Sequence, residues 1–144
     1  MKKRSKTETE SSLKKLLWQD FSKYIRLRDA DKYGFIVCIT CGKVVKWKEA
    51  HAGHGIGGRY NYILFDEELV NGQCFNCNSP IARGGKGGNY GKYAVVLIKR
   101  HGMKWYEKKL KYKVRQFTKQ ELKDLRIYYR EKWQKELLKI KDEF

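Results

Sequence analysis

The amino-acid sequence predicts an α+β protein in which a small core, held together by a metal ion, is flanked by an N-terminal and a C-terminal helix. Four cysteines form two C-x-x-C pairs. Apolar residues recur at helical spacing near both ends of the chain, and β-branched and aromatic residues flank the first cysteine pair. The 144 residues are enough for one domain with a modest core.

The first half of the chain predicts a helix followed by a hairpin. The helix begins at about Thr9 and ends before Gly34. Its apolar stripe consists of Leu13, Leu16, Leu17, Phe21, Tyr24 and Ile25. The hairpin covers residues 35–47, with the first cysteine pair at its tip and Gly42 in the turn. The glycine-rich residues 49–73 are expected to be mostly loop.

The second half predicts four helical segments. The second cysteine pair opens a short helix or turn, and helices are expected over 89–100 and 104–111. A capping box, Thr118-x-x-Glu121, begins the last helix. Its apolar stripe, formed by Leu122, Leu125, Tyr129, Trp133 and Ile140, either folds back on the first helix or forms a dimer interface. The predicted divisions are a basic tail at 1–8, a core domain at 9–112 and a basic C-terminal helix at 113–144.

The cysteine spacing predicts one structural zinc ion. The ligands are Cys38, Cys41, Cys74 and Cys77, and each x-x spacing lets two thiolates face one tetrahedral ion. The polar, basic start has no apolar stretch of a signal peptide, so we expect a cytoplasmic protein. Disulfides are rare in that compartment.

The charge of the chain predicts a polyanionic partner. There are 33 Lys and Arg against 16 Asp and Glu, a formal net charge of +17. Nucleic acid is the commonest partner of so basic a chain. A membrane surface is the weaker alternative, because no apolar run approaches the length of a membrane span.

The 32 residues between the cysteine pairs are more than a simple zinc ribbon needs. They include two histidines, His51 and His54, and Asn78 directly follows the second pair. Metal-assisted phosphodiester cleavage requires a neutral imidazole as general base and a hard divalent cation. A zinc ion with four thiolate ligands has no open position, so the catalytic ion, Mg²⁺ or Mn²⁺, must bind elsewhere.

A string of motifs carries a resemblance to a known family. It runs from Phe21 to Ala30, through Cys38-x-x-Cys41-Gly42-Lys43 and the segment 47–54, to Gln73-Cys74-x-x-Cys77-Asn78 and Gly88-Asn89. This layout resembles zinc-stapled HNH endonucleases, including the phage endonuclease VII type, and most closely the NinG/Rap recombination nucleases of lambdoid phages. The resemblance covers about residues 13–110. It implies a ββα-metal (HNH, treble-clef-like) core and, for a phage-encoded protein, the host cytoplasm.

The resemblance implies an enzyme that cuts branched DNA, such as Holliday junctions and D-loops, with Mg²⁺ or Mn²⁺. It makes His54 the general base, Asn78 a ligand of the catalytic ion, and Arg59 a contact of the scissile phosphate. Gly53 stands where related sites carry Asp. Because side chains alternate along a strand, His51 and Glu49 share the face of position 53 and are further candidate ligands. Symmetric cutting of a junction favours a homodimer.

The sequence also departs from the family pattern. Leu69 replaces the family's Asn five residues before the cysteine, and Asn71-Gly72 replaces its His-Pro. Asn71 is one candidate to brace the loop in place of the missing Asn. The other candidate contacts to nucleic acid are Arg83, Lys86, Lys92, Arg126 and Arg130. Two alternatives stay open, a zinc-stapled DNA-binding protein without catalysis and a zinc-bearing RNA-binding protein, the latter leaving residues 49–54 unexplained.

Overall fold

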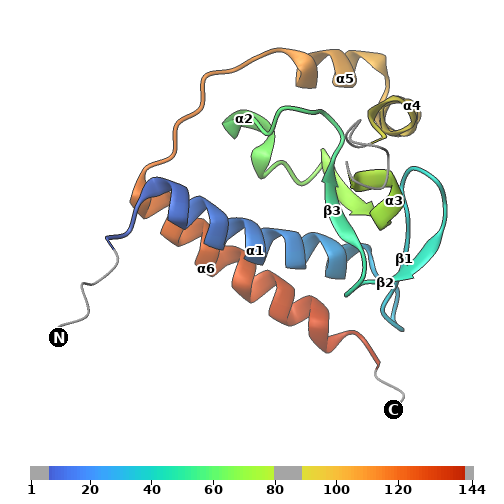
Figure 1. Cartoon of the computed structure of the whole chain (residues 1–144), viewed down its shortest axis with the longest axis horizontal. Coiled ribbons are helices and arrows are strands. Elements are labelled where there is room, and N and C mark those ends of the chain that lie inside the picture. The colour runs from blue at the N-terminus through green and yellow to red at the C-terminus, as the bar shows by residue number, and fades with distance from the viewer. Residues whose placement is uncertain (1–6, 80–88, 142–144) are drawn as a thin grey trace.

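The computed structural model describes residues 7–79 and 89–141, so Arg83, Lys86 and most of the predicted basic tail lie outside the described residues. The described chain combines helices with two two-stranded antiparallel sheets, which confirms the α+β class (Figure 1). Among the described helices, none is long and apolar enough to cross a membrane.

Helix α1 spans Glu10–Asp29 and forms the centre of the main core. Thr9 caps its start: the Thr9 hydroxyl accepts from Ser12 N at 3.1 Å, and Ser12 Oγ accepts from Thr9 N at 3.0 Å. This reciprocal pair satisfies donors that the first helical turn leaves free. The predicted apolar stripe of α1 points inward, and Leu17 and Phe21 are completely buried.

Helix α6, Lys119–Leu138, runs parallel to α1 and packs along it (Figure 1). Lys123 pairs with Glu8 near the starts of the two helices, at 2.8 Å. Near their ends, Lys141 N donates to Lys32 O at 2.7 Å. The stripe of α6 therefore folds back on α1, which settles the choice left open by the sequence.

The start of α6 differs in one detail from the predicted capping box. The Thr118 hydroxyl accepts from Glu121 N at 3.1 Å, as expected. The Glu121 carboxylate does not return to the Thr118 backbone but pairs with Arg115. Ile140, predicted as part of the stripe, lies beyond the last residue of the helix.

A buried carboxylate joins the two long helices. Asp20 is 9% exposed and accepts hydrogen bonds from Trp133 Nε1 at 2.9 Å and Arg126 Nε at 3.1 Å. Because Asp20→Ala leaves both donors without their acceptor, we expect it to lower the free energy of unfolding by about 2–3 kcal/mol. Urea denaturation measures this loss. Asp124→Ala, at an exposed position of α6, is the control, and equal losses for both variants would contradict this role of Asp20.

The two short sheets lie on one side of α1. Strand β1, Phe35–Val37, pairs with β2, Val44–Lys46, as the predicted hairpin. Strand β3, His51–His54, pairs with β4, Val70–Gln73, so that His51 faces Gln73 and Gly53 faces Asn71. Residues 49–73, expected to be mostly loop, thus contain both strands of this sheet and also helix α2, Asn61–Leu64.

Contacts from the end of α1 hold β4 in place. Arg28 donates to the carbonyl of Glu67 at 2.7 Å and to that of Val70 at 3.0 Å. Asp29 Oδ2 accepts from Gly72 N at 2.8 Å. These bonds satisfy backbone groups on the edge of β4 that β3 does not reach. An Arg-Asp pair at the end of a helix thus fixes a strand more than forty residues later in the chain.

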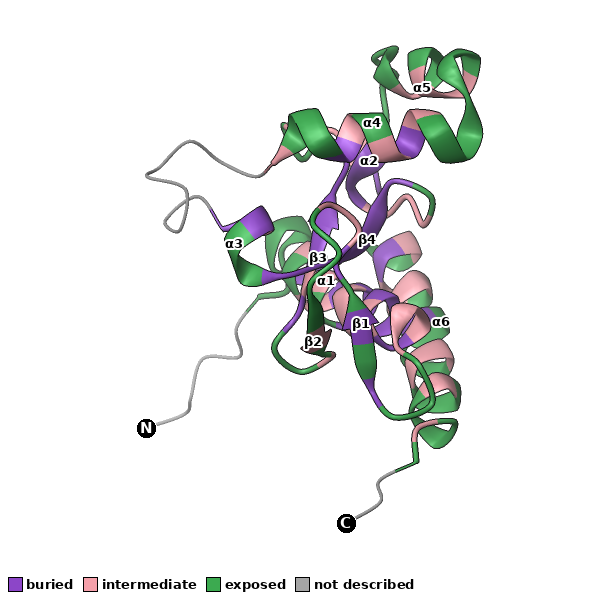
Figure 2. Ribbon diagram, turned by 90° about the vertical axis from the view of Figure 1, so that its right-hand side faces the viewer, coloured by how far each residue is buried: buried purple, intermediate pink, exposed green. Residues whose placement is uncertain are grey.

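Helices α3, Phe75–Asn78, α4, Tyr90–His101, and α5, Met103–Leu110, complete the fold and match the predicted helical segments. Gly102, at φ 93°, makes the sharp turn between α4 and α5 that an L side chain resists. A second core of Ile63, Leu69, Tyr93 and Leu97 lies under α4. Figure 2 shows the buried strands β3 and β4 between α1 and α4, with α5 largely exposed.

Candidate metal cluster and histidine site

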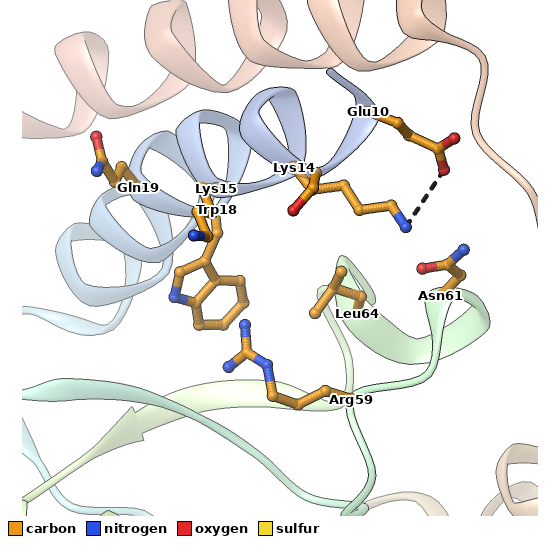
Figure 3. Close-up of a pocket in the computed structure, with 9 residues that line it drawn as sticks. Glu10, Lys14, Lys15, Trp18, Gln19, Arg59, Asn61 and Leu64 are labelled. Carbon is orange, nitrogen blue, oxygen red and sulfur yellow. Dashed lines mark ion pairs between the residues drawn. The ribbon is translucent and has the colours of Figure 1, made fainter. Parts of the chain in front are cut away.

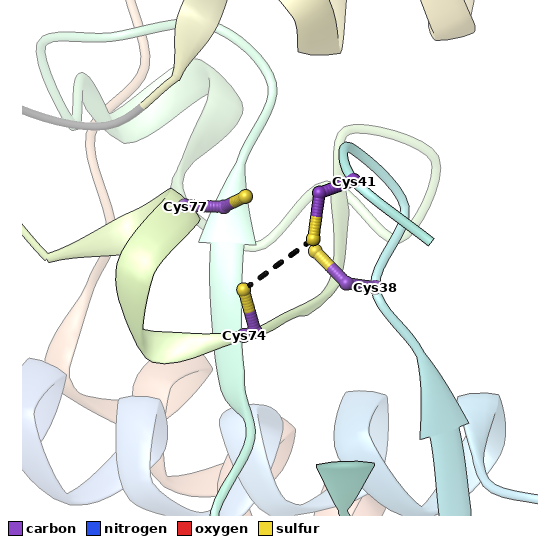
Figure 4. Close-up of side chains that lie close together, drawn as sticks. All are labelled: Cys38, Cys41, Cys74 and Cys77. Carbon is purple, nitrogen blue, oxygen red and sulfur yellow. Dashed lines mark hydrogen bonds between the residues drawn. The ribbon is translucent and has the colours of Figure 1, made fainter. Parts of the chain in front are cut away.

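The four cysteines gather at one point between the β1–β2 hairpin and the start of α3 (Figure 4). Their sulfur atoms all lie within 4.8 Å of one another, and this is the only cluster of metal-ligating Cys, His or acidic groups among the described residues. All four are free thiols. This arrangement can hold a structural metal ion such as zinc, with each chain segment supplying one C-x-x-C pair.

The surroundings of the cluster shift the pKa values of Cys38 and Cys74 in opposite directions. Burial acts to raise the pKa of Cys38, but hydrogen bonds from the Thr40 hydroxyl and nearby backbone N–H groups lower it to about 6. Burial, with the neighbouring sulfur atoms, raises the pKa of Cys74 to about 12. Because four thiolates repel one another at this distance, full ionisation requires a cation between them.

Beside this cluster, β3 and α3 bring His51 and Asn78 together. Asn78 Nδ2 lies 3.0 Å from His51 Nδ1, so the amide donates to the unprotonated ring nitrogen. Burial and the nearby charge of Arg26 lower the pKa of His51, which favours this neutral form. The bond leaves the Asn78 carbonyl oxygen pointing toward Gly53.

His54 is held in a separate environment. The residue is 7% exposed, and its ring stacks on Trp18 of α1, with centroids 5.0 Å apart. Nε2 lies 3.0 Å from the carbonyl of Leu64, and a carbonyl only accepts, so Nε2 carries the proton. Burial is the main reason that the pKa of His54 is lowered. The imidazole is therefore neutral near pH 7, with its lone pair on Nδ1.

The two histidines lie on opposite faces of β3, as alternation along a strand requires. Ala52 and His54 face α1, where Ala52 joins the main core. His51 and Gly53 face Gln73 and Asn78. His51 and Asn78 are therefore in direct contact. His54 directly follows Gly53, the residue that the Asn78 carbonyl oxygen approaches.

Asn71 braces this strand from β4. Its amide donates to Tyr93 Oη at 3.0 Å, and that hydroxyl donates to the carbonyl of Gly53 at 2.8 Å. Arg28 in turn donates to Asn71 Oδ1 at 3.2 Å. Leu69, at the family's Asn position, is completely buried in the second core and makes no polar side-chain contact. Asn71 therefore supports the residue before His54 from a position two residues further along.

A basic cleft of about 680 Å³ opens between α1 and α2 (Figure 3); His54 does not line it, but stacks on Trp18, which does. Trp18 forms part of its wall, and Arg59 lies over the Trp18 ring at 4.7 Å from its centroid. Lys14 and Lys15 line it from α1, opposed by the single carboxylate of Glu10. Arg59 has φ 50°, a backbone conformation that L residues adopt at a cost.

An aromatic surface continues from this cleft. Arg59 and Asn61 line both the cleft and a second hollow of about 290 Å³, whose walls also include Lys113 and Arg115. Three tyrosines meet there. They are Tyr60, Tyr62 and Tyr112, with ring centroids 5.4–6.0 Å apart. Tyr112 is 67% exposed, so cationic groups and an open aromatic ring share one surface.

The remaining predicted contacts lie apart from the cleft. Glu49 is exposed in the turn before β3, and Lys92 is exposed on α4. Arg126 pairs with Asp20 at 3.1 Å, and Arg130 lies 3.8 Å from the same carboxylate. Both arginines thus take part in the α1–α6 contact, and none of these four residues lines the cleft.

Sequence reasoning missed several residues that the structure places at the site. In the sequence, Trp18 is only one more apolar residue of a predicted helix, and Lys14 and Lys15 are typical of a solvent-exposed helix face. Gln73 and Thr40 carried no signal beyond their places beside cysteines. Only the tertiary structure brings α1 against β3 and reveals the cleft.

Fold and site together define a basic α+β protein with a four-cysteine cluster that can hold a structural metal ion, beside a strand that carries two histidines. The chain belongs to the NinG family: the family described as "Bacteriophage Lambda NinG protein" matches residues 1–140. This confirms, at the level of the family, the resemblance seen in the sequence. Comparisons with curated proteins and with solved structures found no significant match.

Proposed function

We propose that this protein is a metal-dependent, HNH-type endonuclease that cuts branched DNA during phage recombination, Holliday junctions and D-loops included. The observation that carries the proposal is the state of His54. It is a buried, neutral imidazole with one nitrogen tied to Leu64, and it lies against Trp18 at the wall of a basic cleft. Such a nitrogen base is what activation of a water molecule requires.

In this mechanism His54 Nδ1 takes a proton from water while the water oxygen attacks the phosphorus atom. One P–O ester bond breaks, and the leaving oxygen is protonated from solvent. The bond from Nε2 to Leu64 O fixes the ring and the tautomer, as a good base needs. Arg59, whose guanidinium lines the cleft, is placed to contact a phosphate.

The proposed activity also needs a divalent ion, Mg²⁺ or Mn²⁺, which when bound stabilises the charge on the phosphate and the leaving oxygen. Asn78 is the residue best placed to hold it, because His51 fixes the amide and leaves the carbonyl oxygen free. Carbonyl oxygens, like carboxylates and water, are hard ligands that suit these ions. In this arrangement His51 orients the ligand, and Glu49 is an exposed residue of the turn before β3.

The cleft and the tyrosine surface fit a branched substrate. Lys14, Lys15 and Arg59 suit contacts to phosphates, which are independent of base sequence. The neighbouring tyrosines offer rings on which unpaired bases stack. Since the stripe of α6 is buried against α1, a two-fold dimer on a junction would use a different surface.

The second candidate is a DNA-binding protein of the same fold without catalysis. The observation that favours it is Leu69, which is completely buried where the family carries Asn. Cleavage separates the two candidates. Labelled four-way junction and linear duplex of the same sequence are incubated with protein and Mn²⁺ or Mg²⁺. We expect cuts in the junction near its branch point and little in the duplex; binding of the junction without cuts would favour the second candidate.

Removal of two cleft lysines is expected to weaken DNA binding by about tenfold at moderate salt. The variant is Lys14→Ala/Lys15→Ala, and the slope of log affinity against log salt should fall by about 1–2, because fewer counterions are released. Lys46→Ala/Lys48→Ala, at the end of β2 and in the turn that follows it, removes the same charge and is the control. Fluorescence anisotropy measures both. Equal weakening by the two variants would mean that net charge, and not the cleft, determines binding.

A further inference from the structure

Gly53 has no room for a side chain. A Cβ atom there would lie 2.7 Å from Gln73 Cδ and 2.9 Å from Asn78 Oδ1, and it would overlap Gln73 Oε1. The backbone of Gly53 is not in the left-handed region that calls for glycine. Glycine is therefore required at this position for space, and the amide of Gln73 fills that space.

The orientation of the Gln73 amide is fixed by Thr40. Gln73 Nε2 donates to Thr40 Oγ1 at 3.3 Å, and the same hydroxyl lies 3.2 Å from Cys38 Sγ. A metal-bound thiolate only accepts, so the hydroxyl proton goes to the sulfur and its lone pairs face Gln73. The NH₂ group of Gln73 thus points to Thr40, and its carbonyl oxygen points to Gly53.

Two amide oxygens consequently meet beside Gly53. Gln73 Oε1 comes from β4 and Asn78 Oδ1 from α3, and each amide is held by a hydrogen bond through its nitrogen. Gln73 is only 1% exposed, so its amide lies inside the protein next to Gly53. Neutral oxygen donors in a fixed pair are suited to Mg²⁺ or Mn²⁺, which keeps the rest of its shell as water.

We propose that Gln73 is a second ligand of the divalent ion, supplying from β4 the oxygen that a side chain at position 53 cannot supply. Thr40 then positions this ligand from the four-cysteine cluster, so that the structural ion and the catalytic ion are linked through one hydroxyl. This inference rests on the proposed function for the presence of a divalent ion, but not for cleavage.

The test is direct binding of Mn²⁺ to the zinc-loaded protein without DNA, read from the electron paramagnetic resonance signal of free Mn²⁺. Asn78→Ala defines the background. Gln73→Glu adds a charge to the ligand and is expected to tighten binding by about tenfold. A gain of affinity cannot arise from damage to the fold. Gln73→Ala is expected to weaken binding by about tenfold or more.

A double variant that moves the ligand from position 73 to position 53 gives a second test. Gly53→Asp clashes with Gln73 in the wild-type chain, but Gln73→Ala removes the two closest contacts and leaves only the one with the end of the Asn78 side chain. The double variant Gly53→Asp/Gln73→Ala should therefore bind Mn²⁺ at least as tightly as wild type. Thr40→Val, which keeps all four cysteines, should weaken binding by about tenfold with zinc content unchanged.

The outcomes separate the two proposals. If wild type binds Mn²⁺ and Asn78→Ala abolishes binding, but Gln73→Glu and Gln73→Ala change nothing, Gln73 only fills space and the inference is wrong. If wild type takes up no Mn²⁺ above the Asn78→Ala background, the inference is also overturned. If the Gln73 series behaves as expected but no junction is cut, the ligand assignment stands and the proposed function fails.

Discussion

Exchange of His54 for glutamine is expected to slow junction cleavage by about 10²–10⁴-fold while leaving DNA affinity unchanged. Glutamine keeps an N–H donor for the carbonyl of Leu64, to which His54 Nε2 is bound at 3.0 Å. It lacks the basic nitrogen that takes the proton from water. The variant therefore removes the chemistry and preserves the hydrogen bond that holds this part of β3. Single-turnover cleavage, measured with protein in excess over labelled junction, reports the rate of the chemical step.

The matched control is His101→Gln. His101 stacks on Trp105 at a centroid distance of 4.0 Å, within the α4–α5 region and outside the cleft. Its exchange should leave both rate and affinity near those of wild type. An equal loss of rate in the two histidine variants, or a His54→Gln protein that cuts normally, would remove His54 from the role of general base.

Loss of the structural metal is expected to unfold the core. Binding of structural zinc in zinc-finger peptides contributes on the order of 10–16 kcal/mol, comparable to or larger than the total stability of a typical domain, about 5–15 kcal/mol. The cluster joins the β1–β2 hairpin to β4 and α3, and three of its four cysteines are buried. Cys77→Ser should therefore abolish the cooperative thermal transition, as should a strong zinc chelator added to wild type.

Elemental analysis should give one zinc ion per chain, and added zinc should restore folding after chelation. Thr40→Val serves as the control, because it alters the surroundings of Cys38 without removing a ligand. A metal-free protein that unfolds at the same temperature as the zinc-loaded one would contradict this account of the cluster. Disulfide bonds among the four cysteines in the purified protein would contradict it as well.

Local sequence signals predicted much of this fold. The apolar spacing of α1 and α6 and the β-branched residues on either side of Cys38–Cys41 each act within one segment of chain. Strand β4 gave no such signal. It contains Asn71 and Gly72, poor strand formers, and it is held by Arg28 and Asp29 from a distant helix. Segments whose structure depends on such partners are not visible in local patterns.

In the candidate site, too, some features follow from local sequence signals and others depend on tertiary packing. The cysteine cluster follows from spacing alone, and its geometry suits one metal ion. The relation of His51 to Asn78, and that of His54 to Trp18, depend on how α3 and α1 pack on β3. Family resemblance supplied His54 and Asn78, and strand alternation added His51 on the face of position 53. Neither indicated that Trp18 stacks on His54 or that the Asn78 amide donates to His51.

Leu69, at the position where the family carries Asn, is the residue that most favours a protein without catalysis. Its side chain belongs to the core under α4, and the polar brace passes instead from Asn71 through Tyr93 to the carbonyl of Gly53. Burial of the Tyr93 hydroxyl raises the pKa of Tyr93 well above its usual range, so this hydroxyl stays protonated and remains a donor. In this chain the carbonyl of Gly53 is thus held through Tyr93 from Asn71, and position 69 takes no part in that contact through its side chain.

In the proposed function, a neutral His54 next to a divalent-ion site cuts branched DNA. The most direct test of this claim is single-turnover cleavage of a labelled four-way junction by zinc-loaded protein, with and without Mn²⁺, with wild type and His54→Gln purified side by side. We predict Mn²⁺-dependent cuts by wild type and at least a hundredfold fewer by the variant, with equal binding. Tight, salt-sensitive binding by both proteins with no cuts by either would contradict the claim.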